Sequence, residues 1–264
     1  MPHTTASDGT RLHYEIFGTG ACDVMLLHGM GSSEIWTPVL PHFDSSRLRI
    51  VTCDFRGHGR STGDAQSFTY PQLHQDILSV ADAAHCTRSV VVGFSGGCNN
   101  AAWLAAKAPQ HVRGLVLVAP PGLGIVPAPP EAVVAFLDSL QHTGDLSEDF
   151  AAWFTEKIGP HRVHAVRPMA ATPRAVLEAS VRLWVETSII DDITGLSVPI
   201  EVIAGAREPL YTPEFQRQTT LAVLPQATMT VVDTSHYSPC EEPAAVAALI
   251  TRFALGLSAN ETAT

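Results

Sequence analysis

Residues 93–97 read Gly93-Phe94-Ser95-Gly96-Gly97, and they lie between two apolar stretches. Val90–Gly93 has the β-branched composition of a strand, and Gly96–Ala108 is apolar on nearly every side, like a helix packed inside a protein. The segment therefore predicts a sharp strand–turn–helix connection with a serine at its tip. Neighbours without a β-carbon let such a turn close, and the turn lifts the hydroxyl above the sheet edge. The alternative is a glycine-rich helix start that binds an anion or merely packs tightly.

Short, mostly apolar runs recur along the chain and predict strands buried on both faces, as in a parallel sheet covered by helices. They are Val24–Leu27, Arg49–Cys53, Val90–Gly93, Leu115–Val118, Ile200–Ala204 and Thr228–Val232. Thr10–Phe17 predicts a further strand after the turn-forming pair Asp8-Gly9. Apolar residues at helical spacing lie between strands, for example at Leu73 and Ile77. The alternation predicts an α/β fold with a doubly wound, mostly parallel sheet.

Residues 120–198 interrupt this alternation, because they contain helix signals but no convincing strand. Glu131–Leu140 is periodic, Ser147 resembles an N-cap, and Thr172-Pro173 opens a segment that runs to about Glu186. The interval is too long for a simple connection, so it predicts an inserted helical cap or lid. We therefore expect a core made of residues 1–119 and 199–256. The small and polar residues 257–264 predict a disordered tail.

Charge and cysteine content argue against several functional classes. The 264-residue chain has a formal net charge of −10, which argues against nucleic-acid binding. Its five cysteines are scattered without a C-x-x-C pair, which argues against a zinc site and fits a reducing cytosol. No signal peptide or membrane-spanning segment is apparent, so we expect a cytoplasmic protein that binds no membrane. No glycine-rich stretch matches a nucleotide fingerprint, so no nucleotide or metal cofactor is predicted.

A serine hydroxyl needs a base within hydrogen-bond reach before it becomes a good nucleophile. His236 is the best candidate base, because it follows the predicted strand Thr228–Val232 and precedes the last helix. This position places it at the sheet edge where Ser95 is expected. His28 and His58 belong to glycine-containing turns and are expected to hold loops together.

Four motifs in the same order resemble those of the α/β-hydrolase fold superfamily. Besides residues 93–97, they are Leu26-Leu27-His28-Gly29-Met30-Gly31, residues 54–61, and Ser235-His236 followed by Glu242-Pro243. The resemblance covers almost the whole chain outside the predicted cap. It implies a serine hydrolase related to esterases, lactonases and C–C bond hydrolases, and a monomer or homodimer whose partner is a small-molecule substrate.

The resemblance also places an acid after the penultimate strand, where residues 205–208 end in Glu208 instead of the usual aspartate. The implied order is Ser95…Glu208…His236. Asp233 is the rival acid, although its closeness to His236 in the chain makes the approach to the ring awkward.

Acyl transfer from an ester also needs donors for the oxyanion, and the candidates are the backbone N–H groups of Met30 and Gly96. Apolar and aromatic residues are expected either to line an apolar substrate pocket or to form the cap's own core. The candidate substrate-binding residues are Phe94, Phe136, Leu140, Trp153, Phe154 and Trp184.

The sequence predicts a serine hydrolase that cleaves a carboxylic ester, lactone or thioester of a hydrophobic small molecule through an acyl-enzyme. C–C bond hydrolysis and cofactor-free perhydrolysis with the same residues stay open as alternatives. A non-hydrolytic ligand-binding or biosynthetic role on the same fold also stays open.

Overall fold

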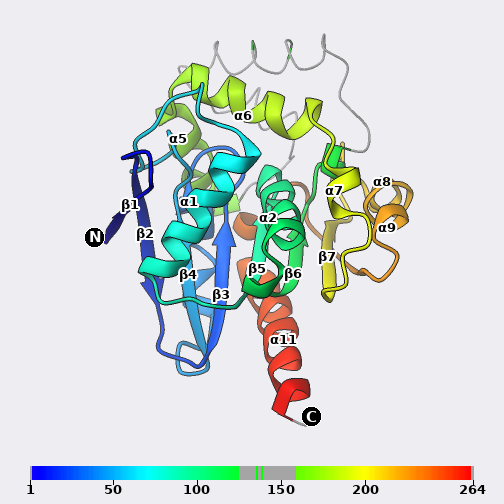
Figure 1. The fold of residues 1–264 in the computed structure, drawn as a ribbon. Helices are drawn as coiled ribbons and strands as arrows, with labels where there is room; N and C mark the ends of the chain where they lie inside the picture. Colours follow the sequence, from blue (N-terminus) through cyan, green and yellow to red (C-terminus); the bar gives the residue numbers. More distant parts are fainter. Residues whose placement is uncertain (1, 125–134, 136–137, 139–158, 263–264) are drawn as a thin grey trace.

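Among the described residues, the strands form one eight-stranded sheet in the order β1-β2-β4-β3-β5-β6-β7-β8 (Figure 1). The structure is a computed structural model that describes residues 2–124, 135, 138 and 159–262. The strands are β1 (His3–Thr5), β2 (Arg11–Phe17), β3 (Cys22–Leu27), β4 (Leu48–Cys53), β5 (Ser89–Phe94), β6 (Val112–Val118), β7 (Ile200–Gly205) and β8 (Thr228–Val232). β2 pairs antiparallel with both β1 and β4. All the other neighbouring strands, in the order β4-β3-β5-β6-β7-β8, pair parallel. The predicted α/β fold is confirmed.

The antiparallel edge of the sheet is a hairpin of β1 and β2. Gly9 has a φ of 89° in the turn, where a glycine avoids strain, and the Thr10 N–H donates to Asp8 Oδ1 at 2.9 Å. The predicted turn at Asp8-Gly9 is therefore present. The sequence does not predict β1, because three polar residues at a sheet edge carry no apolar pattern.

The parallel strands are buried because helices cover both faces of the sheet. The helices are α1 (Tyr70–Ala83), α2 (Gly96–Lys107), α5 (Val163–Ala171), α6 (Arg174–Glu186), α7 (Ile190–Ile193), α8 (Pro213–Gln218), α9 (Thr220–Val223), α10 (Ser238–Glu241) and α11 (Pro243–Thr262). Short 3-10 helices are η1 (Ser33–Trp36), η2 (Leu40–His42), η3 (Pro109–His111), η4 (Gly122–Gly124) and η5 (Gly159–His161). In the described part of the chain, no helix combines the length and apolar character needed to cross a lipid bilayer.

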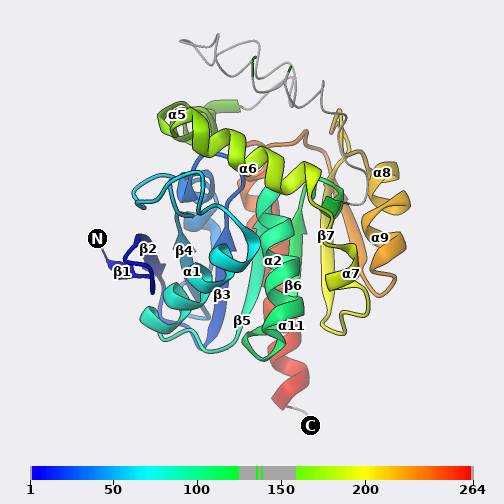
Figure 2. The ribbon, with the colours of Figure 1, turned by 45° about the horizontal axis from the view of Figure 1, so that its top comes forward.

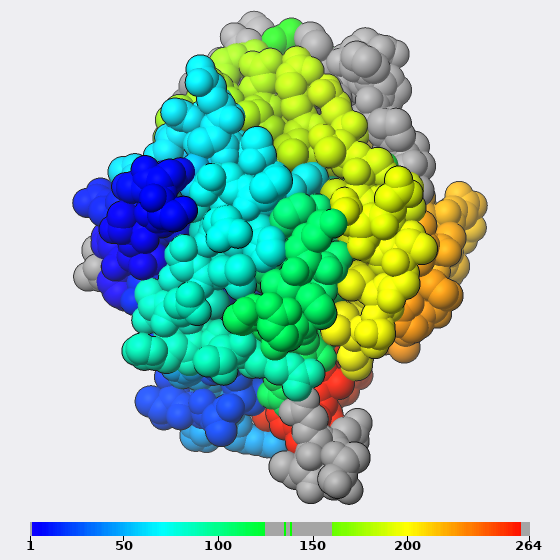
Figure 3. All heavy atoms as spheres, viewed as in Figure 1, coloured from blue at the N-terminus to red at the C-terminus, as the bar shows by residue number. Residues whose placement is uncertain are grey.

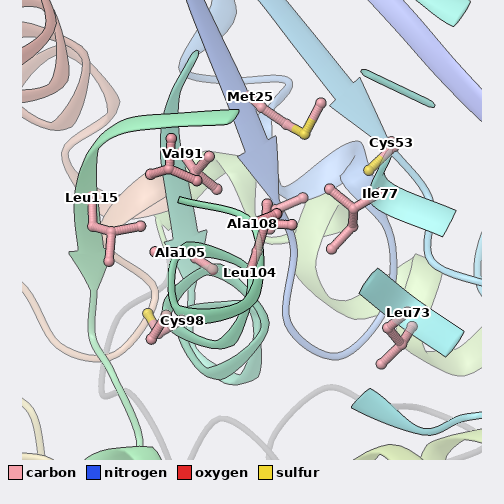
Figure 4. Close-up of a cluster of buried hydrophobic side chains, with 14 of the residues drawn as sticks. Met25, Cys53, Leu73, Ile77, Val91, Cys98, Leu104, Ala105, Ala108 and Leu115 are labelled. Carbon is pink, nitrogen blue, oxygen red and sulfur yellow. The ribbon is translucent and has the colours of Figure 1, made fainter. Parts of the chain in front are cut away.

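The core on the α1–α2 face joins these helices to the central strands. Figure 4 shows Leu73 and Ile77 of α1, Ala105 of α2, and Met25 and Val91 of the sheet, all at most 2% exposed. Full burial of a large apolar side chain contributes about 1.5–3 kcal/mol. A second core lies on the opposite face, which α11 covers (Figure 1). The two cores hold β5 and the start of α2 firmly in the middle of the molecule.

Every described element between β6 and β7 is helical. α5 and α6 lie across the carboxyl ends of the parallel strands, whereas α7 lies beside α2 (Figures 1 and 2). Lys107 Nζ of α2 is 2.6 Å from Asp192 Oδ1 of α7, and Ile193 is fully buried in the core on that face. The predicted helix after Thr172-Pro173 is α6. The helix signals at residues 131–140 and 147 lie outside the described residues, apart from two isolated positions.

The predicted disordered tail at residues 257–264 is wrong for residues 257–262, because α11 continues to Thr262. Leu257 packs so closely on β6 that a β-carbon at Gly114 would lie 2.7 Å from its Cδ1. Arg113 Nη2 also donates to Ser258 Oγ at 3.1 Å. Composition alone does not predict the helix at residues 257–262, because contacts with the distant strand β6 stabilise it.

Candidate functional site

Ser95 lies at the tip of the turn between β5 and α2, with φ 51° and ψ −125°. A residue with a β-carbon is strained at this φ, and strained residues of this kind cluster at functional sites. The Ser95 N–H donates to the Val118 carbonyl at 2.9 Å, and its own carbonyl accepts the Cys98 N–H at 2.9 Å. A β-carbon at Gly93 or Gly97 would lie 2.5 Å from a backbone oxygen, so the turn closes only with glycine there.

The backbone strain can be measured with two substitutions that both remove the hydroxyl. Ser95→Gly should be more stable than Ser95→Ala, because glycine adopts a positive φ without strain. Loss of the backbone strain should stabilise folded Ser95→Gly by about 1–3 kcal/mol, whereas the greater freedom of glycine in the unfolded chain costs about 0.4–1 kcal/mol. We therefore expect the unfolding free energy of Ser95→Gly to exceed that of Ser95→Ala by about 1 kcal/mol. Urea unfolding followed by tryptophan fluorescence measures this difference. A Ser95→Ala variant that is more stable than Ser95→Gly by about 0.4–1 kcal/mol would show that the turn stores no strain.

The structure brings Ser95, His236 and Glu208 together at the carboxyl edge of the sheet. His236 Nε2 lies 3.1 Å from Ser95 Oγ, and His236 Nδ1 lies 2.7 Å from Glu208 Oε2. The His236 and Glu208 side chains are 3% and 0% exposed. A carboxylate can only accept, so Nδ1–H donates to Glu208 and Nε2 is left to accept the Ser95 hydroxyl proton. This arrangement is chemically suited to remove a proton from the serine.

Glu208, and not Asp233, is the carboxylate that contacts His236. The Glu208 Oε1 atom accepts the backbone N–H groups of Leu210 and Tyr211 at 3.3 and 3.4 Å, which holds the side chain in its turn after β7. The Asp233 side chain is 87% exposed and is paired with Arg207 at 2.9 Å. The longer glutamate side chain therefore occupies the position in which the resemblance expects an aspartate.

Aromatic rings surround the His236 imidazole. The ring centroids of Phe94, Tyr211 and Tyr237 lie 5.3, 5.7 and 5.4 Å from that of His236. Burial, reinforced by the nearby Glu208 carboxylate, raises the pKa of the Tyr211 phenol, so the phenol is neutral at pH 7. Phe94, a predicted substrate-binding residue, is thus packed against the imidazole. Sequence reasoning missed Tyr211, although it lies three positions after Glu208 in the same loop.

The segment after β3 meets the Ser95 turn. A β-carbon at Gly29 would lie 2.9 Å from Ser95 Cβ and 3.4 Å from the Gly96 nitrogen. Met30 follows directly and packs against both cores. Gly96 is the first residue of α2, where backbone N–H groups have no partner within the helix. The two predicted oxyanion donors, Met30 and Gly96, therefore belong to segments that touch at Ser95.

His28 and His58 hold loops and do not occupy the position of a base. His28 Nδ1 donates to the Gly29 carbonyl at 2.6 Å, and its Nε2 accepts the Phe55 N–H at 2.9 Å. Burial lowers the pKa of His28 to about 4 and that of His58 to about 3. Both rings are therefore neutral at pH 7, and the two His28 nitrogens are already used in shaping the segment that precedes Met30.

Trp184 of α6 covers the first residue of α2. A β-carbon at Gly96 would lie 2.1 Å from the Trp184 ring, which is 3% exposed. The indole packs edge to face on Phe68, with 5.7 Å between centroids, and Asn99 Nδ2 donates to the Trp184 carbonyl at 3.0 Å. Figure 3 shows α6 lying directly on the segment that precedes α1. Trp184 is thus next to the Ser95 turn.

The other predicted substrate-binding residues cannot be placed in the site. Phe136, Leu140, Trp153 and Phe154 lie outside the described residues.

Comparisons with known proteins agree with this architecture. Residues 24–145 match the family model of the alpha/beta hydrolase fold. The chain is 25% identical to 3-oxoadipate enol-lactonase 2 of Acinetobacter baylyi, over 95% of this chain and 97% of that protein. It is 34% identical to pimeloyl-[acyl-carrier protein] methyl ester esterase of Edwardsiella ictaluri, over 41% of this chain and 40% of that protein. A solved enol-lactonase of Burkholderia xenovorans matches with a TM-score of 0.80 and 23% identity, covering 96% of this chain and 99% of that one.

The family match covers the central strands and the Ser95 turn, and the structural match extends over nearly the whole chain. The mostly parallel sheet and the position of the turn after β5 are those that the sequence led us to expect. The chain therefore has the α/β-hydrolase fold.

Proposed function

We propose that the protein is a serine hydrolase that cleaves a carboxylic ester, lactone or thioester of a hydrophobic small molecule. The observation that carries the proposal is the buried series of contacts from Ser95 Oγ through the His236 imidazole to the Glu208 carboxylate. Each atom in it has the partner that nucleophilic catalysis requires. The strained backbone at Ser95 is further support, since it directs the hydroxyl out of the turn.

In the first half of the reaction, Ser95 Oγ attacks the substrate carbonyl carbon while its proton passes to His236 Nε2. Glu208 stabilises the imidazolium that forms. The carbonyl oxygen becomes an oxyanion, for which the Met30 and Gly96 N–H groups are the proposed donors. One donor of this type contributes about 3–4 kcal/mol to stabilising the transition state. The bond to the leaving oxygen or sulfur then breaks, and His236 returns the proton to the leaving atom.

In the second half, water attacks the acyl-enzyme and gives its proton to His236. Collapse of the second tetrahedral intermediate releases the carboxylic acid and returns the proton to Ser95 Oγ. A lactone is compatible with this scheme, because its leaving oxygen stays attached to the acyl group and the product is a hydroxy acid. The resemblance to an enol-lactonase over nearly the whole chain supports a lactone or ester as substrate.

An apolar substrate is favoured by the side chains around Ser95. Trp184 covers the start of α2, and α5 and α6 lie over the carboxyl ends of the strands (Figure 2). We interpret α5 and α6 as part of a cap that covers bound substrate. The indole of Trp184 offers an apolar surface beside the nucleophile, where an acyl chain or ring can lose its contact with water.

A fluorophosphonate probe tests the proposal. Ser95 Oγ should form a bond to phosphorus while the P–F bond breaks, and intact-mass measurement should show one adduct per chain at neutral pH. The adduct should be absent in Ser95→Ala and unchanged in Ser46→Ala, a matched substitution of an exposed serine. Hydrolysis of p-nitrophenyl esters and of simple lactones should be lost together with labelling. Wild-type protein that stays unlabelled and hydrolyses neither substrate class would refute the proposal.

A further inference from the structure

The Glu241 carboxylate accepts two hydrogen bonds from Ser235, the residue that precedes His236. Its Oε2 atom accepts the Ser235 backbone N–H at 2.9 Å, and its Oε1 atom accepts the Ser235 hydroxyl. The Glu241 side chain is 4% exposed. Burial of a carboxylate costs free energy unless it is paired and hydrogen-bonded, so these contacts are what make the buried charge tolerable. Both polar groups that Ser235 can donate are directed to one carboxylate.

Arg207 connects the same carboxylate to the turn that carries Glu208. Its Nη2 atom lies 3.4 Å from Glu241 Oε2 and 2.8 Å from the Asp233 carbonyl. The Arg207 backbone N–H donates to the Thr234 carbonyl at 2.8 Å. Arg207 immediately precedes Glu208 in the chain, just as Ser235 immediately precedes His236. The neighbours of the proposed acid and of the proposed base are therefore bound to the same carboxylate, that of Glu241.

The His236 loop needs such contacts because it lies between regular elements. β8 ends at Val232 and α10 begins at Ser238, so His236 belongs to neither a strand nor a helix. Its imidazole must nevertheless meet a hydroxyl and a carboxylate at the same time. Catalytic groups must be held within about 0.5 Å of the productive geometry, and side chains around them supply that precision.

We propose that Glu241 is a positioning residue. Through its contacts with Ser235 and Arg207, it holds the His236 imidazole where the ring contacts both Ser95 and Glu208. This inference rests on the proposed function, since it requires His236 to be the base. Glu241 is assigned no part in the bond-making steps. Its effect should therefore appear in kcat, and it should vanish when His236 is absent.

The test compares Glu241→Gln with Glu242→Gln, which makes the same charge change at the next, exposed residue. Activity is expressed per site titrated with the fluorophosphonate, so that unfolded molecules do not count. We expect kcat of Glu241→Gln to fall about 10- to 100-fold with KM within about twofold, as for a small misplacement of a reacting group. Glu242→Gln should match the wild type.

A second measurement separates positioning from general destabilisation. In a His236→Ala background, Glu241→Gln should lower the residual kcat no further, because residues that act as a unit are not additive. Ser235→Ala removes only the hydroxyl contact and provides a milder variant should Glu241→Gln fold poorly. We expect it to reduce kcat per titrated site about threefold to tenfold in the presence of His236. In the His236→Ala background, where the probe no longer titrates the site, activity is expressed per folded chain and should not change.

Two results would overturn the inference while the proposed function stands. One is a kcat per titrated site in Glu241→Gln and Ser235→Ala equal to that of the wild type. The other is the same loss in the presence and absence of His236. Failure of the wild-type protein to react with the probe is a distinct result, which would reject the proposed function itself.

Discussion

His236→Ala should lower kcat for a p-nitrophenyl ester by about 10⁶-fold, because without the imidazole nothing accepts the Ser95 proton. The His236 Nε2 atom is the group that the structure places 3.1 Å from Ser95 Oγ. The rate of fluorophosphonate labelling should fall with kcat, since both reactions need the same nucleophile. Stopped assays with matched enzyme concentrations and far-UV circular dichroism measure the activity and the fold.

The control for this substitution is His42→Ala, which removes an exposed histidine at the end of η2. It should retain the wild-type kcat and labelling rate. If His236→Ala kept more than about a tenth of the activity, general-base catalysis by this residue would be excluded, since such catalysis contributes at least about 10²-fold.

Glu208→Gln should reduce kcat by about 10³- to 10⁴-fold and leave KM nearly unchanged, because an amide neither stabilises the imidazolium nor selects the productive tautomer. The substitution preserves the size of a side chain that is fully buried against His236. Initial rates over a range of ester concentrations separate kcat from KM. Thermal unfolding of the same preparation shows whether the fold is retained.

Asp233→Asn is the informative comparison for Glu208→Gln. The Asp233 side chain is 87% exposed and is bound to Arg207, so its substitution should cost far less activity. A greater loss in Asp233→Asn than in Glu208→Gln would assign the acid to Asp233. Glu208→Asp is a further test of the acid. Its shorter side chain should weaken the 2.7 Å contact with His236 Nδ1 and give a kcat between those of the wild type and Glu208→Gln.

Local sequence patterns were sufficient for the central part of the fold. A strand such as β5 is apolar at nearly every position because both of its faces are buried, and that composition is visible without neighbours. The turn at Ser95 was predictable for a similar reason, since the need for glycine at position 93 comes from the Gly97 carbonyl, only four residues further along the chain. β1 was not predictable, because its three polar residues carry no apolar pattern, and the end of α11 was not predictable, because contacts with distant residues stabilise it.

By itself, the sequence determined strands β2 to β8 of the sheet, the serine at the turn after β5 and the histidine before the last helices, because each depends on residues close together in the chain. Only the tertiary structure decided between Glu208 and Asp233, placed Trp184 on Gly96 and joined Glu241 to Ser235. Such contacts depend on the direction in which a side chain leaves its loop, and packing against the rest of the molecule sets that direction.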